Sequence, residues 1–149
     1  MSRMSDDVTV AQLGEVTWRD APIRPDWIVS GAPRARCADL SLSTDGLAVT
    51  AAWDCSAGTF RWHNNVDETV HILEGGVTVT DAAGVTRSLR PGDVALFRRG
   101  TTFTWHVPQY VRKLAFLRHP VPRPAAATLQ AAARLRGGIA RRLSGRARA

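Results

Sequence analysis

Short segments rich in β-branched and apolar residues follow one another between residues 37 and 118, with turn residues between them. Within several segments, apolar and polar positions alternate with the period of two expected for a strand that buries one face. Glycine stands at or beside five of the predicted reversals, for example at residues 56–58, where it accepts a positive φ without steric cost. The pattern predicts an all-β domain, an antiparallel sandwich or barrel. The nine expected strands are residues 37–43, 47–55, 59–63, 68–74, 77–81, 85–89, 94–97, 102–107 and 111–118.

The two flanking regions lack this pattern. Prolines interrupt residues 1–36, and we expect an irregular arm that lays Trp18 and Trp27 against the barrel. After residue 120 the chain is rich in alanine and arginine, a composition that favours helix, with a break expected at Gly137–Gly138. The expected parts are an N-terminal arm (1–36), a β-barrel (37–120) and a basic tail that is partly helical or disordered (121–149).

The positive charge is concentrated in the tail. The net charge is +7, but residues 1–120 hold 13 basic and 13 acidic side chains, which cancel. The other seven arginines lie in residues 121–149, which contain no acidic residue and carry a thin apolar stripe at Leu135, Ile139 and Leu143. We expect a solvated tail, with contact to nucleic acid, an anionic membrane surface or an acidic partner as alternatives. Arginine outnumbers lysine nineteen to one in the whole chain, so the arginines alone do not decide among them.

Other features of the sequence exclude several classes of protein. No apolar run approaches the roughly 18 residues of a membrane span, and two aspartates near the N-terminus occupy the place of a signal peptide's apolar segment. We therefore expect no membrane span and a cytoplasmic location. Cys37 and Cys55 are too few for a disulfide scaffold and lack metal-site spacing. We expect buried free thiols, although both residues lie on strands that we expect to pair.

Two stretches of the chain carry a recognisable pattern. Residues 58–75, GTFRWHNNVDETVHILEG, and residues 91–105, PGDVALFRRGTTFTW, resemble the first and second motifs of the cupin superfamily. The similarity is greatest to a small single-domain branch that groups with the ureidoglycine aminohydrolase and ethanolamine-utilisation cupins. It implies a double-stranded β-helix, the cupin jelly-roll barrel, in agreement with the predicted strands. It also implies a homodimer, because cupins commonly pair through their outer sheet faces.

In metal-binding cupins the two motifs supply three or four metal ligands, and few of these are present here. Phe103 replaces the histidine of the second motif. If Glu68 and Trp105 face inward, alternation turns His71 and His106 outward. We therefore expect no metal or other cofactor, with a divalent metal as the less favoured alternative. By resemblance, the first two ligand positions fall on Trp62 and Asn64 in one register or on Arg61 and His63 in the other, so that at best His63 and Glu68 remain.

The residues left inside the barrel form an aromatic pocket around a carboxylate. Desolvation disfavours a charged carboxylate, so Glu68 is the candidate general acid or base and the candidate partner of a cationic ligand. Aromatic faces also attract ammonium groups. The alternative is that Glu68 forms a salt bridge with an inward basic side chain such as Arg61 or Lys113 and holds no ligand. The predicted pocket consists of Trp62, His63 at its mouth, Glu68, Phe103 and Trp105.

Three functions remain open at this point. The favoured one is binding of a small polar or cationic metabolite in the barrel, by a binding protein or by a metal-independent enzyme with Glu68 as acid or base. The second is a metal-dependent, aminohydrolase-like cupin enzyme that uses His63 and Glu68. The third is a non-enzymatic ligand sensor or scaffold whose basic tail contacts an acidic partner. The sequence does not decide whether a reaction is catalysed.

Overall fold

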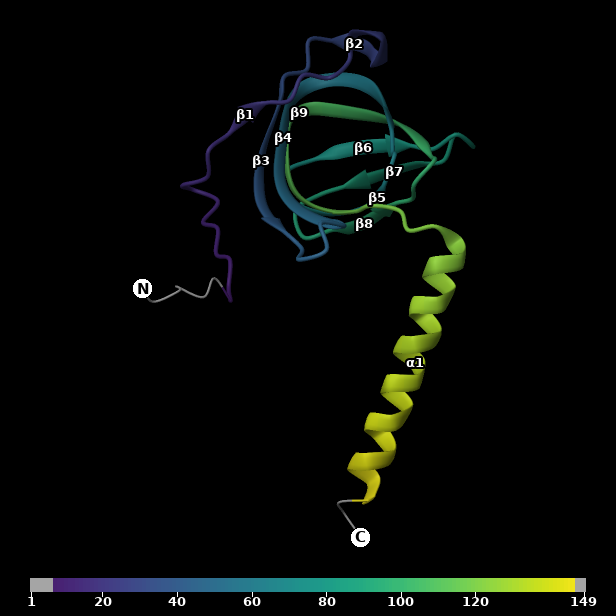
Figure 1. The fold of residues 1–149 in the computed structure, drawn as a ribbon. Helices are drawn as coiled ribbons and strands as arrows, with labels where there is room; N and C mark the ends of the chain where they lie inside the picture. The colour runs from purple at the N-terminus through teal and green to yellow at the C-terminus, as the bar shows by residue number, and fades with distance from the viewer. Residues whose placement is uncertain (1–6, 147–149) are drawn as a thin grey trace. The chain divides into compact units, whose positions relative to one another are not determined.

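The computed structural model describes the backbone of residues 7–146 and the side chains of residues 7–136. An all-β region is followed by one helix, as the sequence predicts (Figure 1). The chain divides into two units, Met1–His119 and Pro120–Ala149, which are described separately below. The strands are β1 (Arg19–Asp20), β2 (Ile28–Gly31), β3 (Ala35–Leu42), β4 (Ala48–His63), β5 (Asp67–Gly75), β6 (Val77–Thr80), β7 (Thr86–Leu89), β8 (Val94–Phe97) and β9 (Thr102–Arg118), with a 3-10 turn at Pro25–Trp27 before β2.

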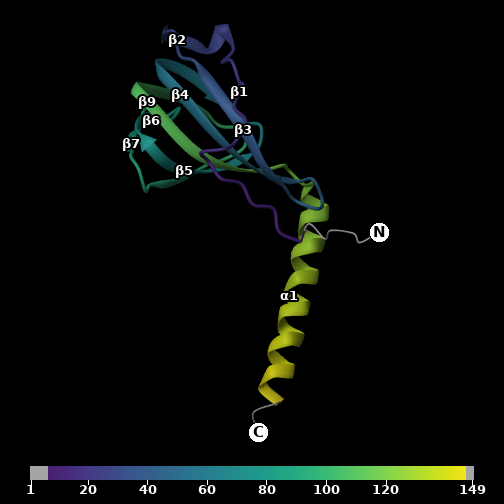
Figure 2. The same cartoon turned by 90° about the vertical axis from the view of Figure 1, so that its left-hand side faces the viewer.

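Two long strands, β4 and β9, form the centre of the fold. They pair antiparallel along almost their full length. The first half of β4 also pairs with β3 and its second half with β2, whereas β9 pairs with β6 through its first half and with β5 through its second. The two strands therefore pass from one layer into the other, and both views show them side by side and curving round the interior (Figures 1 and 2). This is the predicted jelly roll, although the sheet does not close within the described residues. One layer has the strand order β1-β3-β4-β9-β5-β8, and the other has the order β2-β4-β9-β6-β7.

The described residues form nine strands, the number predicted, but several of the predicted strand boundaries are wrong. Two pairs of predicted strands are in fact single strands, β4 and β9, and the arm supplies two short strands, β1 and β2, that were not predicted. The reversal predicted at residues 56–58 is therefore wrong. The predicted segments that merge are 47–55 with 59–63 and 102–107 with 111–118.

A bulge lies where that turn was expected. The register between β4 and β9 shifts between Ser56 and Gly58, so that one residue of β4 lies opposite two of β9. One of those two is Pro108, whose missing N–H is tolerated at a bulge. Gly58 is required by packing, because a Cβ there would lie 2.7 Å from the ring of Pro33. Since a bulge bends a strand, this one helps carry β4 and β9 from one layer to the other.

The N-terminal arm packs on the barrel through short strands and apolar side chains. β1 pairs with β3, and β2 pairs with β4. Ile23 is buried in the core and Trp27 packs against it. Trp18 contacts basic groups instead: the guanidinium carbons of Arg36 and Arg112 lie 5.1 and 5.3 Å from the centre of its ring.

Side chains alternate along β5 and the greater part of β9 as predicted. Glu68 and Val70 are buried on β5, whereas His71 is only half-buried. On β9, Trp105 is buried and His106 is exposed. His71 and His106 therefore lie on the outward positions of their strands, as the alternation predicts.

Both cysteines are free thiols, as predicted, but only Cys55 is buried; Cys37 is partly exposed, so the predicted burial is wrong for that residue. Cys37 on β3 pairs with Trp53, and Cys55 on β4 pairs with Ala35, so the thiols are not cross-strand neighbours. Burial raises the pKa of Cys37, and it raises that of Cys55 to about 12. Because the thiolate is the reactive form, Cys55 is an inert core residue.

The described residues of the second unit form one helix, α1 (Arg123–Arg146). The predicted break at Gly137–Gly138 is wrong, because the helix continues through both glycines. Each glycine costs about 1 kcal/mol relative to alanine in a helix, and the neighbouring residues are strong helix formers. Leu135 is 69% exposed, while the other two positions of the predicted stripe, Ile139 and Leu143, lie outside the residues whose side chains are described. Among the described residues, no helix has the length and apolar character needed to cross a membrane.

Candidate functional site

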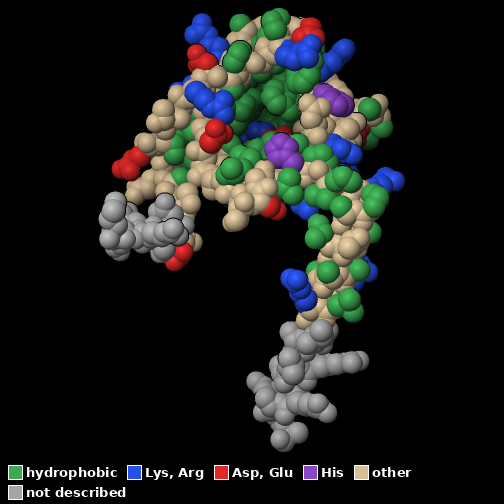
Figure 3. Space-filling model, in the orientation of Figure 1, with side chains coloured by type: hydrophobic (Ala, Val, Ile, Leu, Met, Phe, Trp, Pro, Cys, Tyr) green, Lys and Arg blue, Asp and Glu red, His purple; other side chains and the backbone are tan. Residues whose placement is uncertain are grey.

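A cavity of about 340 Å³ lies between the two layers of the β unit. Much of its wall is aromatic. Trp53 is edge-on to Phe60, Trp62 and Trp105, with ring centroids 6.1 to 6.4 Å apart. Phe60 also stacks on Trp105 at 6.3 Å. The space-filling view shows the β unit hollowed on one face, with hydrophobic side chains around the hollow (Figure 3).

Two opposite charges are buried in this apolar wall. Lys113 on β9 and Glu68 on β5 are each 5% exposed, and both line the cavity. Lys113 Nζ donates a hydrogen bond to Glu68 Oε1 and forms an ion pair with it. The ammonium also lies 5.0 Å from the centre of the Trp53 ring and 4.8 Å from that of Trp105, a cation–π arrangement. Each buried charge therefore has a compensating partner inside the protein.

Strand alternation places Lys113 in the interior. Val111, Lys113 and Ala115 are all buried on β9, with less buried residues between them. From the sequence, Lys113 is predicted only as one of two alternative partners of Glu68 in a salt bridge that holds no ligand. The structure has that salt bridge and a cavity beside it, so the two interpretations of Glu68 are not exclusive.

Four of the five predicted pocket residues line the cavity: Trp62, His63, Glu68 and Trp105. His63 is exposed, and its Nδ1 lies 2.9 Å from Thr102 Oγ1. Phe103, the fifth predicted residue, lies elsewhere and lines a different depression of the barrel. Its ring packs edge-on against Phe97 at 4.9 Å, and Phe97 in turn lies 5.2 Å from Trp105. Phe97 thus stands between Phe103 and the rings of the cavity wall.

The cavity includes residues that sequence reasoning did not assign to it. Trp53 is a residue of the hydrophobic core and also lines the cavity beside Lys113. Arg19 on β1 and Asp39 on β3 also line the cavity, and Arg19 Nη2 donates to both carboxylate oxygens of Asp39 at 3.1 and 2.9 Å. Both of these side chains are more than half exposed. No local signal in the sequence predicts this pair, because it depends on the pairing of the arm with β3.

Asn64 and Trp105 contribute buried donors. Asn64 is 3% exposed and Trp105 is 2% exposed, and both residues line the cavity. Asn64 Nδ2 and Trp105 Nε1 have no hydrogen-bond partner within the described residues. Buried donors normally have a partner, so two of them beside one cavity favour a ligand with acceptor atoms.

The residues at the cupin metal-ligand positions do not fit a metal ion. Trp62 in one register and Arg61 in the other offer no ligand atom suited to a divalent cation, and Phe103 offers none in either. Only Asn64 or His63 would then accompany Glu68, whose carboxylate already faces the ammonium of Lys113. A cation placed at Glu68 would be repelled by that ammonium. Within the described part of the chain, no three His, Cys, Asp or Glu side chains gather in a way that could hold a metal.

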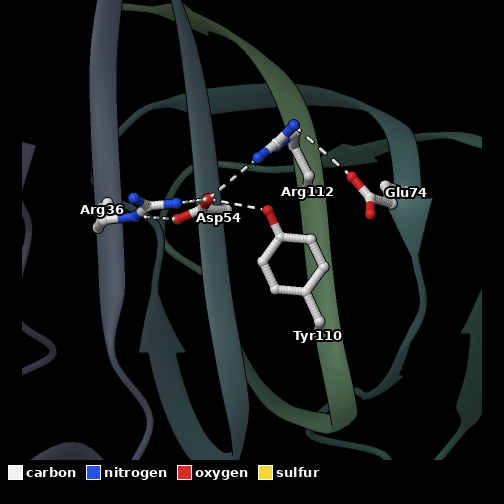
Figure 4. Close-up of polar contacts among 5 residues, drawn as sticks. All are labelled: Arg36, Asp54, Glu74, Tyr110 and Arg112. Atoms are coloured by element: carbon white, nitrogen blue, oxygen red, sulfur yellow. Dashed lines mark hydrogen bonds and ion pairs between the residues drawn. The ribbon is translucent and has the colours of Figure 1, made fainter. Parts of the chain in front are cut away.

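A polar cluster lies on the outer face of the same strands (Figure 4). Asp54 follows Trp53 in β4 and therefore points away from the cavity, yet it is only 2% exposed. Arg36 donates to both of its carboxylate oxygens, at 3.1 and 2.6 Å, and the Tyr110 hydroxyl donates to Oδ2 at 2.9 Å. The cluster therefore ties β3, β4 and β9 together by side-chain contacts.

This cluster also fixes the residue next to Lys113. Arg112 Nη2 lies 3.7 Å from Asp54 Oδ2, and Arg112 Nη1 lies 3.6 Å from Glu74 Oε2. Burial alone would raise the pKa of Asp54, but the hydrogen bonds from Arg36 and Tyr110 outweigh burial, and the pKa is lowered. Because Arg112 is held on the outer face, the next side chain along β9 is directed into the cavity.

Comparison with protein families agrees with this architecture. Residues 42–115, which include β4 to β8 and the part of β9 that carries Lys113, match the model of the EutQ-like cupin domain family. The protein carries a EutQ-like cupin domain. The resemblance inferred from the two sequence motifs is thereby confirmed.

Solved structures share the cupin fold. A protein of unknown function from Pseudomonas syringae pv. tomato str. DC3000 is 21% identical with a TM-score of 0.64; the match covers 69% of this chain and 45% of that chain. A putative ethanolamine utilization protein Q from Salmonella typhimurium LT2 is 21% identical with a TM-score of 0.53, covering 70% and 95%. A predicted oxalate decarboxylase from Thermotoga maritima is 19% identical with a TM-score of 0.57, covering 74% and 99%.

These similarities extend to the fold and no further, because all three identities are below 25%. The match also spans less than half of the Pseudomonas protein. A comparison with curated proteins finds no match. The function of this cupin domain must therefore be argued from its own residues.

Proposed function

We propose that the interior cavity of this cupin domain binds a small organic molecule. The observation that carries the proposal is the ion pair of Lys113 and Glu68, buried in the aromatic wall of a cavity of about 340 Å³. Ligand pockets commonly combine apolar and aromatic walls with a few well-placed polar groups, and their volumes begin at about 300 Å³. The rings supply contact area, and the ion pair supplies the polar group that orients the ligand.

The charges favour a polar ligand over a cationic one. Lys113 already provides a cation to Glu68 and to the faces of Trp53 and Trp105. A second ammonium would have to displace it. The unpartnered donors of Asn64 and Trp105 instead favour a ligand with acceptor oxygen atoms. Of the polar and cationic metabolites that the sequence left open, we therefore favour the polar class.

A metal-independent enzyme is the second candidate. Glu68 touches an ammonium group, so a proton has a short path between the two side chains. Such a pair suits general acid and base work on a ligand bound beside it. This candidate shares the cavity and the ligand class with the binding function and differs only in turnover.

The metal-dependent alternative, with His63 and Glu68 as ligands, is less favoured because Lys113 occupies the carboxylate. Metal analysis of protein purified without a histidine tag tests it: stoichiometric Mn, Fe, Ni or Zn would revive the hypothesis. The homodimer, the cytoplasmic location and an acidic partner of the tail remain predictions from the sequence.

Tryptophan side chains allow a direct test of the cavity. The five tryptophans give five indole N–H signals in a nitrogen–proton NMR spectrum, each assignable by a Trp→Phe variant. Benzyl alcohol is a suitable probe because it combines an aromatic ring with one hydroxyl group. We expect it to shift the signals of Trp53, Trp62 and Trp105, which line the cavity, and to leave Trp18 unchanged.

Two matched variants separate the cavity from the other depression. Ala115→Leu adds volume to the wall of the cavity, whereas Ala95→Leu adds the same volume to the wall of the depression that contains Phe103. We expect Ala115→Leu to abolish the benzyl alcohol shifts and Ala95→Leu to retain them. If both variants respond alike, or if Trp18 shifts as much as Trp62, the cavity is not the binding site.

A further inference from the structure

The distribution of basic residues sets Lys113 apart. The chain contains nineteen arginines and one lysine, so arginine serves almost everywhere that a positive charge is needed. The one lysine is 5% exposed and lines the cavity. A lysine differs from an arginine in that its primary amine readily gives up a proton and then acts as a nucleophile. The position that has lysine is the one position where such an amine meets a cavity and a carboxylate.

We propose that Lys113 is a nucleophile that forms a reversible imine with a carbonyl ligand in the cavity. The inference rests on the proposed function, since the cavity must first admit a small molecule. It narrows the ligand to an aldehyde or a ketone. It also gives Glu68 a defined role, as the group that takes and returns the proton.

The atoms and charges of this imine formation balance without any further reactant. The ammonium of Lys113 passes one proton to the carboxylate that it touches, Glu68, and the free amine attacks the carbonyl carbon. The new C–N bond forms as the carbonyl π bond breaks, and the oxygen becomes a hydroxyl by taking a proton from the attacking nitrogen. Glu68 then returns its proton to this hydroxyl, which leaves as water. The products are a protonated imine on Lys113, one water molecule and the original Glu68 carboxylate.

The site is electrostatically suited to this product. A protonated imine carries the same single positive charge as the ammonium it replaces, so Glu68 remains paired throughout. The rings of Trp53 and Trp105, at 5.0 and 4.8 Å from Nζ, attract the iminium as they attract the ammonium. No step leaves an isolated charge in the interior, which would cost several kcal/mol.

A purely structural lysine would have the same geometry but different reactivity. Lysine is more compact than arginine, and a buried ion pair alone could favour it at this position. The two roles are separated by whether the amine reacts with a carbonyl compound faster than an ordinary lysine does.

The single lysine makes this measurement unambiguous. The full chain is incubated with benzaldehyde at neutral pH and reduced with sodium borohydride, whose hydride converts an imine into a stable benzylamine, and the products are mapped by peptide mass spectrometry. An Arg61→Lys variant supplies an exposed reference lysine on β4, outside the cavity lining. We expect benzylation of Lys113 at least about tenfold faster than at position 61, because a partner that transfers protons contributes 10²–10⁴-fold in enzymes.

Further variants test the proton transfer. Glu68→Gln removes the proton acceptor and is expected to lower labelling of Lys113 by about tenfold or more, with labelling at position 61 unchanged. Lys113→Arg abolishes labelling at residue 113. The comparison of Lys113 with the lysine introduced by Arg61→Lys uses protein in which Glu68 is intact. It therefore holds even if Glu68→Gln or Lys113→Arg fails to fold.

The outcomes separate this inference from the proposed function. If benzyl alcohol shifts the lining indole signals but Lys113 is labelled no faster than position 61, the cavity binds small molecules and the imine is refuted. If neither benzyl alcohol nor benzaldehyde shifts the signals of Trp62 or Trp105, both proposals fail. Fast labelling of Lys113 that benzyl alcohol suppresses by competition supports both.

Discussion

The ion pair of Lys113 and Glu68 makes a quantitative prediction about stability. Glu68→Gln leaves an ammonium buried without its carboxylate, and breaking a buried pair in this way costs about 3–5 kcal/mol. Here the lysine keeps its contacts with the faces of Trp53 and Trp105, each worth about 0.5–2 kcal/mol, so we expect a loss near 3 kcal/mol. Lys113→Met leaves the carboxylate alone and loses those contacts too, so we expect a loss of about 3–5 kcal/mol.

The double variant decides whether these losses come from the pair. Glu68→Gln with Lys113→Met removes both charges and replaces the lysine by an apolar chain of similar length. Its free energy of unfolding should lie within about 1 kcal/mol of the unsubstituted protein, because replacing a buried pair by apolar groups is often neutral or stabilising. The losses of the single variants are then strongly non-additive.

Urea unfolding followed by tryptophan fluorescence and circular dichroism measures these free energies. Asp39→Asn is the matched control, because it breaks the Arg19–Asp39 pair, whose side chains are 59% and 65% exposed, and it should cost no more than about 1 kcal/mol. The reasoning is refuted if Glu68→Gln and Lys113→Met each cost less than about 1 kcal/mol and their effects add.

Three further predictions concern other parts of the chain. Because the pKa of Asp54 is lowered in the fold, its stabilising effect is complete above about pH 4 and is lost as the pH falls; urea midpoints at pH 7 and pH 3 should therefore differ less in Asp54→Asn than in the unsubstituted protein. Gly75→Ala would place a Cβ 1.9 Å from the carbonyl oxygen of Tyr110 at a φ of 71°, so thermal unfolding should show a loss well above the roughly 1 kcal/mol expected for Gly84→Ala, where no atom lies within 4 Å of the new Cβ. If all seven tail arginines contact DNA phosphates, binding should weaken with salt at a log–log slope near about −6, and deleting residues 121–149 should abolish it; unchanged binding after the deletion rules the tail out.

Local sequence predicts much of the fold. β5 and β8 lie within one residue of their predicted bounds, because apolar alternation and flanking turn glycines are local signals. The bend near Gly58 could not be predicted in the same way. A glycine with small neighbours is as typical of a tight turn as of a bulge, and what decides here is the ring of Pro33 and the register with β9, both remote in sequence.

The residues of the cavity, like the strands, are predicted only in part by the local sequence. Alternation places Trp62, Glu68 and Trp105 on inward positions, and all three line the cavity. Alternation also turns Phe103 inward, but it cannot say which part of the interior a side chain reaches, and Phe97 separates Phe103 from the cavity. Trp53 lines the cavity because the two layers of the sheet curve round it. No single segment of the sequence specifies that curvature.

Glu68 connects the family resemblance to the chemistry proposed for this chain. A carboxylate buried in an aromatic interior needs a positive partner. The cupin motifs imply a metal ion for that role, held in part by histidines; this chain has Trp62 and Asn64 at the first two of those positions in one register, Arg61 and His63 in the other, and Phe103 at the last in both. Here the partner is the ammonium of Lys113, held by the same carboxylate and by two aromatic faces. Both solutions satisfy the same electrostatic requirement, but a metal ion polarises a ligand by coordination, whereas an amine can bond to one covalently. A cavity without the histidine ligands is therefore compatible with the proposed imine chemistry, since a lysine amine, once deprotonated, is a nucleophile.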